Sequence, residues 1–496
     1  MKIRLVPTAS GSAAVQVVRY SGSRTVVLKH IGSGKSREDI RALKQLAGDW
    51  IEQQSGQKRL FRWPEEDSGD RLLGKYRYLG FRYGLIATTV LAVLRRFGLK
   101  PDSFPSASLF LNLVLARIVA PGSKRQAREL LASGFGISYS LTAIYAALPE
   151  LAGKQSLIER RLIAFAKVNL GFDFNFVLYD MTTLYFETFK GDRLRRIGFS
   201  KDNKPGQPQI LVGLIVDRSG FPLAFSVFPG SRFEGSTLIP VILGFKRKYR
   251  VDNLTVVADA AMISQANVLA LKKAGLNYIV GARMANAPLE IISKVSQCLN
   301  RVDGARLKLH TADGFLICHF SRSRYHKDKH ERQKQLDKAG QIIQGRRPPG
   351  RNRFLLKQPA AAYSLNTGLV KKSKLLLGIK GYHTNLNLPD ELVIERYRDL
   401  WQVEKAFRLS KADLAARPVY HFKSRAITAH LLICVTALAV LKWLEIATGK
   451  PAGYVVDKLK SITDARLLNL VTGKETLLRA EIPEEISLML KKIRPH

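Results

Sequence analysis

The chain has 496 residues, of which 80 are Lys or Arg and 40 are Asp or Glu, so its formal net charge is +40. Hydrophobic residues make up 46% of the chain, which excludes disordered and collagen-like classes, and the length predicts about three domains at roughly 150 residues each. A field this positive attracts polyanions, nucleic acid first and an anionic membrane surface second.

Residues 1–75 are predicted to be a small β-rich region followed by a linker. Short alternating segments with glycine turns between them predict three strands at 3–6, 14–20 and 25–28. An amphipathic pattern predicts a helix over 38–53, and the polar segment 54–75 has the composition of a linker.

Residues 76–170 are predicted to be helical and to bind DNA. Two short helices at 123–133 and 140–148, around Gly134 and Gly136, are compatible with a helix-turn-helix. Plain helical packing explains the same pattern.

Residues 171–282, together with 389–423, are predicted to form a catalytic core. Apolar runs at 174–179 and 254–258 indicate strands, and Asp217-Arg218-Ser219-Gly220 indicates a hairpin between strands at 210–216 and 221–228. Helices at 237–249 and 265–273 and a strand at 277–280 complete the pattern. This order predicts an α/β fold with a mixed sheet covered by helices.

Residues 283–388 interrupt that pattern and are interpreted as a basic insertion. They contain a hairpin signal at Ala312-Asp313-Gly314, a charged helix near 327–345 and an arginine-rich loop at 345–351. Such charge is typical of a solvated face, and phosphate contact explains it equally well.

One helix is predicted over 390–414, with Asn387 as its cap and Pro389 in its first turn. Residues 424–496 are predicted to be a helical C-terminal region that begins with an apolar helix at 424–446. Its most apolar stretch, 431–441, is shorter than the roughly 20 residues of a membrane span, so it is interpreted as a buried helix.

Two aspartates follow the apolar strands, Asp180 after the first and Asp259 after the fourth. Ligands gather outside strand ends in such sheets, and Mg²⁺ removes the repulsion between two carboxylates placed there. The alternative is that each aspartate only begins the turn after its strand.

A third carboxylate, Glu404, lies among apolar and aromatic residues on one face of the 390–414 helix. A carboxylate there is costly unless it binds a cation or pairs with Arg408 four residues on. Two strand aspartates and a helix glutamate, in this order, can hold two metal ions for phosphoryl transfer. The residues alone therefore indicate a nuclease-like core.

The same residues resemble a known family. The run at 179–187, Tyr-Asp-Met-Thr-Thr-Leu-Tyr-Phe-Glu, resembles the first catalytic motif of the DDE transposases of bacterial insertion sequences, and 257–262 resembles the second. Tyr397, Glu404 and Lys411 stand at three positions of the "YREK" signature, which marks insertion-sequence family four and its relatives. Leu400 occupies the arginine position, and Arg398 lies close by.

Further similarity lies at 204–230, at Arg417-Pro418-Val419-Tyr420-His421 and at Ala429-His430-Leu431, so the resemblance covers about residues 100–450. It implies a ribonuclease-H-like catalytic core with a mostly β insertion at 283–388. It also implies a homodimer that binds the terminal inverted repeats of its own element.

By this resemblance, Asp180, Asp259 and Glu404 would hold two Mg²⁺ ions, for which Mn²⁺ can substitute. Water activated by the metal would free a 3′-OH at each transposon end, and that hydroxyl would attack target DNA. The DNA contacts are assigned to four residues of the signature helix: Tyr397 and Lys411 on phosphates, Arg408 beside them, and Trp401 on an unpaired base or, alternatively, in the core.

Two other functions share these features: a DNA-binding protein that has lost catalysis, and a ribonuclease-H-like nuclease without strand transfer.

Three cysteines cannot form a disulfide framework in a chain of this length, and no apolar signal segment begins it. We therefore expect a cytoplasmic protein with no membrane partner, and the resemblance implies that it is bacterial and nucleoid-associated.

Overall fold

A computed structural model describes residues 1–9, 11–22, 24–55, 75–251, 253–262, 264–358 and 363–494. Most of the predicted linker at 54–75 lies outside these residues. The chain divides into two compact units. Unit 1 comprises Met1–Thr89, Glu129–Ser138 and Val456–Lys491, and unit 2 comprises Val90–Arg128, Tyr139–Val455 and Lys492–His496.

The N-terminal part of unit 1 is an antiparallel sheet with one helix against it. Its elements are β1 (Lys2–Pro7), β2 (Ala13–Ser21), β3 (Arg24–Gly34) and α1 (Arg37–Ser55). Val15 and Val17 of β2 are fully buried against Leu43 and Ala47 of α1, because alternate strand residues point to the helix side. The three predicted strands and the helix are confirmed.

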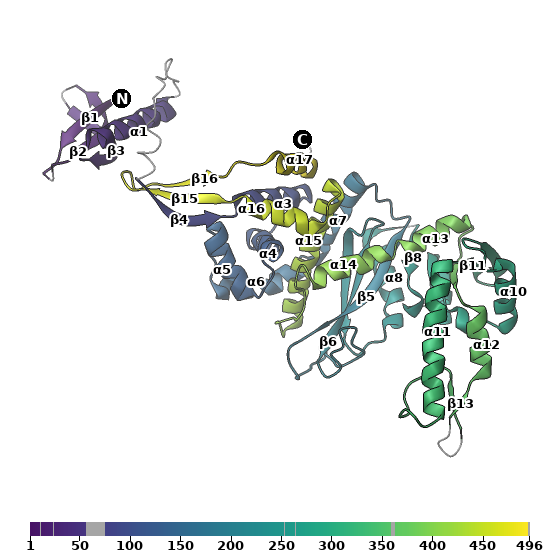
Figure 1. Ribbon diagram of the computed structural model, residues 1–496. Helices are drawn as coiled ribbons and strands as arrows, with labels where there is room; N and C mark the ends of the chain where they lie inside the picture. The colour runs from purple at the N-terminus through teal and green to yellow at the C-terminus, as the bar shows by residue number, and fades with distance from the viewer. Residues whose placement is uncertain are drawn as a thin grey trace. The chain divides into compact units, whose positions relative to one another are not determined.

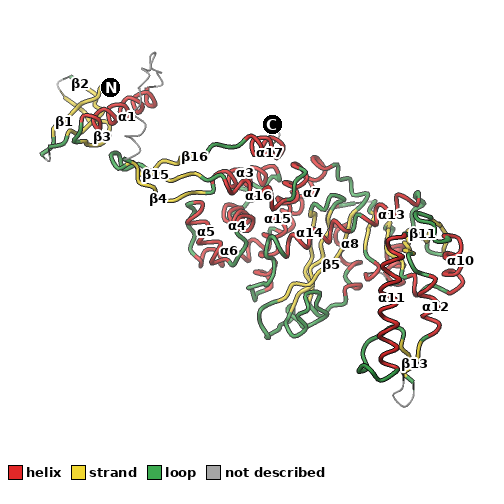
Figure 2. The backbone as a smooth tube through the Cα atoms, viewed as in Figure 1, coloured by secondary structure: helices red, strands yellow, loops and turns green. Residues whose placement is uncertain are grey.

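A second sheet of unit 1 joins segments from distant parts of the chain, in the order β16-β15-β4 (Figure 2). Its strands are β4 (Tyr76–Arg82), β15 (Asp464–Asn469) and β16 (Glu475–Arg479). These residues were predicted to belong to helical regions, and that prediction is wrong for them. Local pattern could not reveal the partner of β4, which lies almost four hundred residues further along the chain.

Unit 2 has a bundle of helices on one side of its sheet. The helices of this bundle that lie wholly within unit 2 are α4 (Ala107–Val119), α6 (Leu141–Gly153), α7 (Gln155–Leu170) and α15 (Ser424–Thr448). Within the described residues, α15 is the one helix long and apolar enough to cross a membrane, but 94% of its apolar window is buried inside the protein. Because α4, α6 and α7 pack against it, α15 is a core helix, as predicted.

Among the described residues, four helices have residues in both units. They are α3 (Gly84–Arg96), α5 (Lys124–Leu130), α16 (Ala452–Ser461) and α17 (Glu484–Ile493). A π-helical turn, Leu131–Phe135, follows α5, and Gly136 then takes a left-handed conformation at φ 71° before α6. The two predicted short helices around the glycines are therefore present, and their DNA-reading role stays a prediction.

The catalytic core predicted at 171–282 contains five strands of an eight-stranded mixed sheet. They are β5 (Val177–Tyr185), β6 (Gln209–Val216), β7 (Pro222–Pro229), β8 (Thr255–Ala258) and β9 (Asn277–Ala282). Their spatial order is β7-β6-β5-β8-β9; β6 is antiparallel to β5, while β8 and β9 run parallel to it. With α8 (Leu238–Tyr249) and α9 (Gln265–Lys273), they form the mixed α/β, ribonuclease-H-like core that was predicted.

The insertion differs from the mostly β segment that the resemblance implied. Its elements are α10 (Leu289–Leu299), β10 (Arg306–Thr311), β11 (Gly314–Phe320), α11 (Arg322–Ile343), β12 (Leu355–Lys357), β13 (Tyr363–Leu365), α12 (Thr367–Leu375) and β14 (Ile379–Thr384). More of these residues are helical than extended. The insertion is mixed because β10, β11 and β14 continue the core sheet beyond β9, and α10 packs on them.

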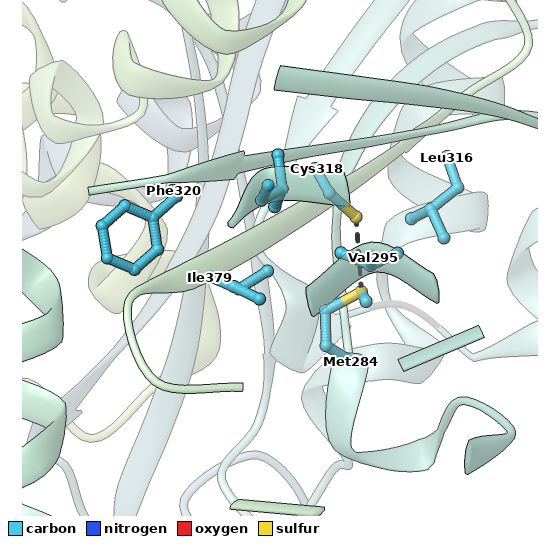
Figure 3. Packing of buried hydrophobic residues seen from close by; sticks show 7 residues of the cluster. Met284, Val295, Leu316, Cys318, Phe320 and Ile379 are labelled. Carbon is cyan, nitrogen blue, oxygen red and sulfur yellow. Dashed lines mark hydrogen bonds between the residues drawn. The ribbon is translucent and has the colours of Figure 1, made fainter. Parts of the chain in front are cut away.

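A small apolar cluster fixes the insertion on the sheet (Figure 3). It joins Met284 and Val295 with Leu316, Cys318 and Ile379, from both helical and strand segments. Without β14, strand β9 would expose its backbone donors and acceptors along an open edge, so the pairing of β14 with β9 protects the core.

The helix predicted over 390–414 is two helices, α13 (Asp390–Arg398) and α14 (Trp401–Lys411). At the junction the backbone hydrogen bonds join residues three apart, as in a 3₁₀ turn: Leu400 N donates to Tyr397 O at 3.2 Å. Ion pairs to Arg396 and Arg218, at 3.3 and 3.5 Å, hold Asp399 at the break.

The predicted start of that helix is also corrected. Pro389 occupies the N-cap position, and the Asn387 side chain accepts a hydrogen bond from Lys308 Nζ at 2.8 Å. The lysine of β10 therefore takes the asparagine oxygen that was expected to cap the helix.

Candidate active site

A cleft of about 950 Å³ in unit 2 brings the three predicted carboxylates together. Asp180 comes from β5, Asp259 from the end of β8, and Glu404 from α14, which lies beside the sheet (Figure 1). The parallel pairing of β5 with β8 sets Tyr179 opposite Ala258, so the aspartates that follow these residues lie on neighbouring strands. The cleft is the candidate active site.

Asp180 does not end its strand, contrary to the prediction. Strand β5 continues to Tyr185 because its pairing with β6 continues, with Asp180 opposite Leu214. The strand continues through the polar residues Thr182 and Thr183, which are buried. The apolar run in the sequence therefore ends before the strand does. Asp259 directly follows the last residue of β8, as predicted.

The carboxylates differ in their surroundings. Burial raises the pKa of Asp180 to about 6, opposed by the positive charge of Lys201 and reinforced by Glu234 and Asp259. Glu404 is exposed, and across the described residues its carboxylate has neither a hydrogen bond nor an ion pair. The alternative in which Glu404 pairs with Arg408 is therefore not what the structure contains.

Tyr397 holds Asp259. Its hydroxyl donates to Asp259 Oδ1 at 2.7 Å, and its side chain is only 5% exposed. The ring packs 4.8 Å from that of Tyr382, with Lys380 Nζ 4.4 Å from its centroid. Burial, and then the charge of Asp259, raise the pKa of Tyr397 above its usual range, so the hydroxyl stays a donor. The structure thus directs this hydroxyl to a carboxylate, where a phosphate contact was predicted.

The hydroxyl of Tyr397 approaches the backbone of β9 closely. A Cβ at Gly281 would lie 2.5 Å from this hydroxyl and 2.9 Å from Ala260. A side chain at this position would therefore push the tyrosine away from Asp259.

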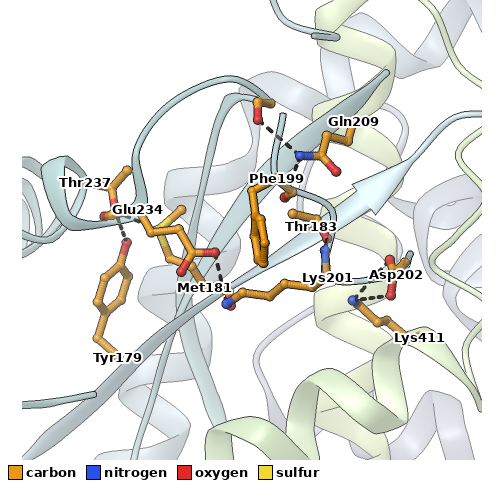
Figure 4. A network of polar contacts seen from close by, with 11 residues as sticks. Tyr179, Met181, Thr183, Phe199, Lys201, Asp202, Gln209, Glu234, Thr237 and Lys411 are labelled. Atoms are coloured by element: carbon orange, nitrogen blue, oxygen red, sulfur yellow. Dashed lines mark hydrogen bonds and ion pairs between the residues drawn. The ribbon is translucent and has the colours of Figure 1, made fainter. Parts of the chain in front are cut away.

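Lys411 lines the cleft with its ammonium bound to a residue that the sequence did not single out. Its Nζ lies 3.0 and 3.3 Å from the two oxygens of Asp202, and Arg417 Nη2 lies 3.6 Å from the same carboxylate (Figure 4). Asp202 follows Lys201 in a charged loop, where a solvated side chain is the ordinary expectation. Tertiary structure buries it to 7% exposure.

Lys201 is a second residue missed from the sequence. Its Nζ donates to Met181 O at 2.7 Å and pairs with Glu234 at 3.0 Å, which fixes the loop beside Asp180 (Figure 4). The break between α13 and α14 also lets both Arg398 and Leu400 line the cleft. An uninterrupted helix would have pointed them in different directions.

Two further predicted residues lie at the cleft. Trp401 is 51% exposed, which contradicts the alternative of core packing, and Lys405 Nζ lies 5.5 Å from its ring. Arg408 is exposed and also lines the cleft. Both side chains are accessible to a bound ligand.

The donor chemistry of the cleft fits a hard divalent cation, because all three candidate ligands are carboxylates. In the part of the chain that the structure describes, no three His, Cys, Asp or Glu side chains are close enough together to hold one ion. The carboxylates therefore share a cleft without converging on a single point.

A second groove, of about 830 Å³, adjoins the cleft and shares Asp259, Lys380 and Tyr397 with it. Most of its other lining residues belong to the insertion, and they include five cations: Arg283, Arg324, Arg332, Arg353 and Lys372. The insertion therefore contributes positive charge immediately beside the candidate active site.

The family described as "Transposase DDE domain" matches residues 173–440, more than half of the chain. This segment contains all three carboxylates. The match concerns the domain as a whole and does not single out the YREK-signature group. No curated protein matches the chain significantly.

Two solved structures are distantly similar. A piggyBac transposase synaptic complex with hairpin DNA has 10% identity and a TM-score of 0.37, over 78% of this chain and 71% of that one. A Mos1 transposase paired-end complex with the left transposon end has 13% identity and a TM-score of 0.16, over 48% and 66%. These scores are too low to support the fold, which rests on the strand order itself.

Proposed function

The chain belongs to the DDE transposase domain family, and from this premise we propose that it cleaves DNA at the ends of its own insertion sequence and joins them to target DNA. The observation that carries the proposal is the single cleft that Asp180, Asp259 and Glu404 all line, inside the matched segment. The partners would be the terminal inverted repeats and a target duplex, bound by a homodimer.

Asp180, Asp259 and Glu404 would hold divalent cations, Mg²⁺ or Mn²⁺, which supply Lewis-acid stabilisation of the charge that develops on the phosphoryl oxygens. The protein's own part is to position these carboxylates. Strand pairing fixes Asp180, and the Tyr397 hydroxyl orients one oxygen of Asp259, leaving its other oxygen available. Such supporting hydrogen bonds typically preserve ligand geometry.

DNA would bind at the cleft through the cations that surround the carboxylates. Lys201, Lys380, Arg398 and Arg408 all line it, in a chain whose net charge is +40. Neutralising phosphates in this way releases counterions, so affinity should fall steeply with salt. Trp401 lies exposed at the same cleft, where its ring can stack on an unpaired base.

The test is a nicking assay on labelled DNA that carries the flanking repeats of the protein's own locus, with and without Mg²⁺. We expect metal-dependent cleavage at the repeat boundary and its loss in Glu404→Gln. Glu391→Gln is the matched control, because this glutamate is exposed on α13, pairs with Arg306, and does not line the cleft. Tight binding without cleavage under either metal would instead indicate a DNA-binding derivative.

The second candidate, a ribonuclease-H-like nuclease without strand transfer, is supported by the same three carboxylates. Pre-cleaved ends with a free 3′-OH distinguish it, because they need no hydrolysis. A transposase joins such ends to a supercoiled target, whereas a nuclease leaves them unjoined.

A further inference from the structure

A small cavity in unit 2 is lined by basic side chains. It has a volume of about 220 Å³ and lies among α4, the start of α5, the segment after α14, and α15. We call it the basic pocket and define it by Arg117, Lys124, Arg417, His421 and His430. None of the residues that line it is acidic.

Lys124 is the most unusual group in the basic pocket. It is only 4% exposed, and among the residues that the structure describes it has neither a hydrogen bond nor an ion pair. A buried ammonium is costly unless something pairs with it. Burial, and then the charge of Arg117, lower the pKa of Lys124 to about 7. The side chain therefore lines a cavity while lacking the partner that its chemistry requires.

Two other basic groups, Arg117 and His430, are oriented by neutral acceptors. Arg117 Nη1 donates to Leu414 O at 3.3 Å and to Ala415 O at 3.4 Å, and His430 Nε2 lies 3.1 Å from Ala416 O. Backbone carbonyls of this kind fix the direction of a cation without cancelling its charge. The segment that follows α14 thus holds two basic side chains in place beside Lys124.

His421 completes the wall of the basic pocket. Its ring lies 6.2 Å from that of Tyr145 and 5.5 Å from that of His430. Burial, and then the charges of Lys124 and Arg117, lower the pKa of His421 to about 4. The imidazole is therefore neutral near pH 7 and can donate one N–H, while Lys124 and Arg117 supply charge.

Arg417 connects the basic pocket to the candidate active site. It lines both cavities, and its Nη2 lies 3.6 Å from Asp202, the residue that binds Lys411. Its Nε is buried and has no hydrogen-bond partner among the described residues. A polyanion lying in the cleft would therefore have its next negative charges close to the basic pocket.

We propose that the basic pocket binds a backbone phosphate of the DNA whose cleavage site lies in the adjoining cleft. The cavity admits a tetrahedral oxyanion, its unpaired lysine and its arginines match that charge, and its histidines add neutral donors. The proposal rests on the proposed function for the identity of the polyanion. It gives a role to the Arg417–His421 segment and to His430, which the catalytic cleft leaves unexplained.

The test measures binding of an inverted-repeat duplex by fluorescence anisotropy over a range of salt concentrations. Lys124→Met, which preserves length and burial, should reduce the log–log salt slope by about 1 and weaken binding about tenfold near 0.1 M salt. Lys100→Met is the matched control, because Lys100 is exposed in the turn between α3 and α4 and lies outside both cavities. The salt slope of this variant should equal that of the parent protein.

A second arm separates DNA from a free anion. Inorganic phosphate is titrated into the DNA-free protein while its melting temperature is followed. Stabilisation that is lost in Lys124→Met, together with an unchanged DNA salt slope, would identify a small-anion site and overturn the proposal. An unchanged slope and no response to phosphate would show that Lys124 is only a buried, neutral lysine, which also overturns it.

Two controls keep the result interpretable. If Lys124→Met does not fold, His421→Gln replaces it; this variant retains an N–H donor but alters its position. It should weaken duplex binding without the full change in salt slope. Unaltered duplex binding by His421→Gln contradicts the proposal. Glu404→Gln should bind with the parent's slope and fail to cleave. Failure of the parent to cleave would therefore refute the proposed function without affecting the slope measurement.

Discussion

The candidate active site and the basic pocket are adjoining cavities that differ in the groups lining them: the cleft has three carboxylates among cations, whereas no acidic residue lines the basic pocket. In the cleft, the exposed carboxylate of Glu404 has no hydrogen-bond or ion-pair partner among the described residues, and burial disfavours the ionised form of Asp180. In the basic pocket, Lys124 is buried and has no counterion in the part of the chain that the structure describes. The cleft thus presents one carboxylate, and the basic pocket one ammonium, that has no partner among the described residues, which is the arrangement that the proposed metal and DNA ligands would require.

Glu159 shows how the same unit treats a buried charge that has a structural role. It is 2% exposed, and its oxygens accept hydrogen bonds from Tyr249 OH at 2.8 Å, Gln155 Nε2 at 2.9 Å and the Phe225 backbone N–H at 3.2 Å. Lys248 adds an ion pair at 2.5 Å. The contrast indicates that the incomplete pairing at the two cavities is a property of those sites, and four substitutions can test it.

The largest effect is expected from Asp180→Asn, which keeps the shape of the side chain and removes its charge. Cleavage of end-labelled DNA should fall by about 10³-fold or more, because the developing charge loses its stabilisation. Stability in urea should not fall, since burial already disfavours the ionised form of Asp180. A variant that cleaves normally would show that Asp180 is not a ligand.

Glu159→Ala should have the opposite profile. It removes the acceptor for several buried donors and leaves Lys248 unpaired, so the free energy of unfolding should decrease by about 3 kcal/mol. Urea denaturation measures this, and cleavage per folded molecule should be unchanged. If the free energy of unfolding decreases by less than about 1 kcal/mol, the contacts of Glu159 contribute little to stability. Glu159 could then not serve as the example of a well-paired buried charge with which the two cavities are compared.

Lys124→Met should raise the free energy of unfolding at pH 7 by about 2 kcal/mol, because it replaces an unpaired buried ammonium with an apolar chain. The pKa of Lys124 is about 7 in the folded protein and 10.5 in the unfolded chain. The parent's stability should therefore rise from pH 7 toward pH 10.5, where the folded state has already released the proton.

Charged or titratable groups near Lys124 are Arg117, Arg417, His421, His430, Cys434, Tyr145 and Tyr420. Burial lowers the pKa values of both histidines, so they stay neutral in this range. The difference between the parent and Lys124→Met should therefore shrink as pH rises. A difference that is constant with pH would contradict the lowered pKa.

The smallest effect is expected from Tyr397→Phe, which removes one hydrogen bond to Asp259 and keeps the ring. Loss of a supporting hydrogen bond typically costs about 10–100-fold in activity or metal affinity. Cleavage should fall by that factor while duplex affinity stays unchanged. If affinity falls and the cleavage rate of bound DNA does not, Tyr397 contacts phosphate, as the sequence predicts.

Local pattern was sufficient for much of the core and for the choice of candidate carboxylates. Strands β6 and β7 were predictable because Asp217-Arg218-Ser219-Gly220 is a strong turn signal between two apolar runs. Glu404 stood out because a carboxylate is unusual on an apolar helical face. Such signals lie within short segments of the sequence, so they can be recognised without knowledge of the tertiary structure.

The sequence alone determined the positive charge of the chain, the order of its core strands and the three acidic residues of the cleft. Only tertiary structure decided that Asp180 lies within β5, that the signature helix breaks at Leu400, and that β4 pairs with β15. It also decided that Tyr397 binds Asp259 and that Lys124 is buried with no partner among the residues described. These facts depend on pairings between segments that are far apart in the chain, for which propensity and spacing carry no information.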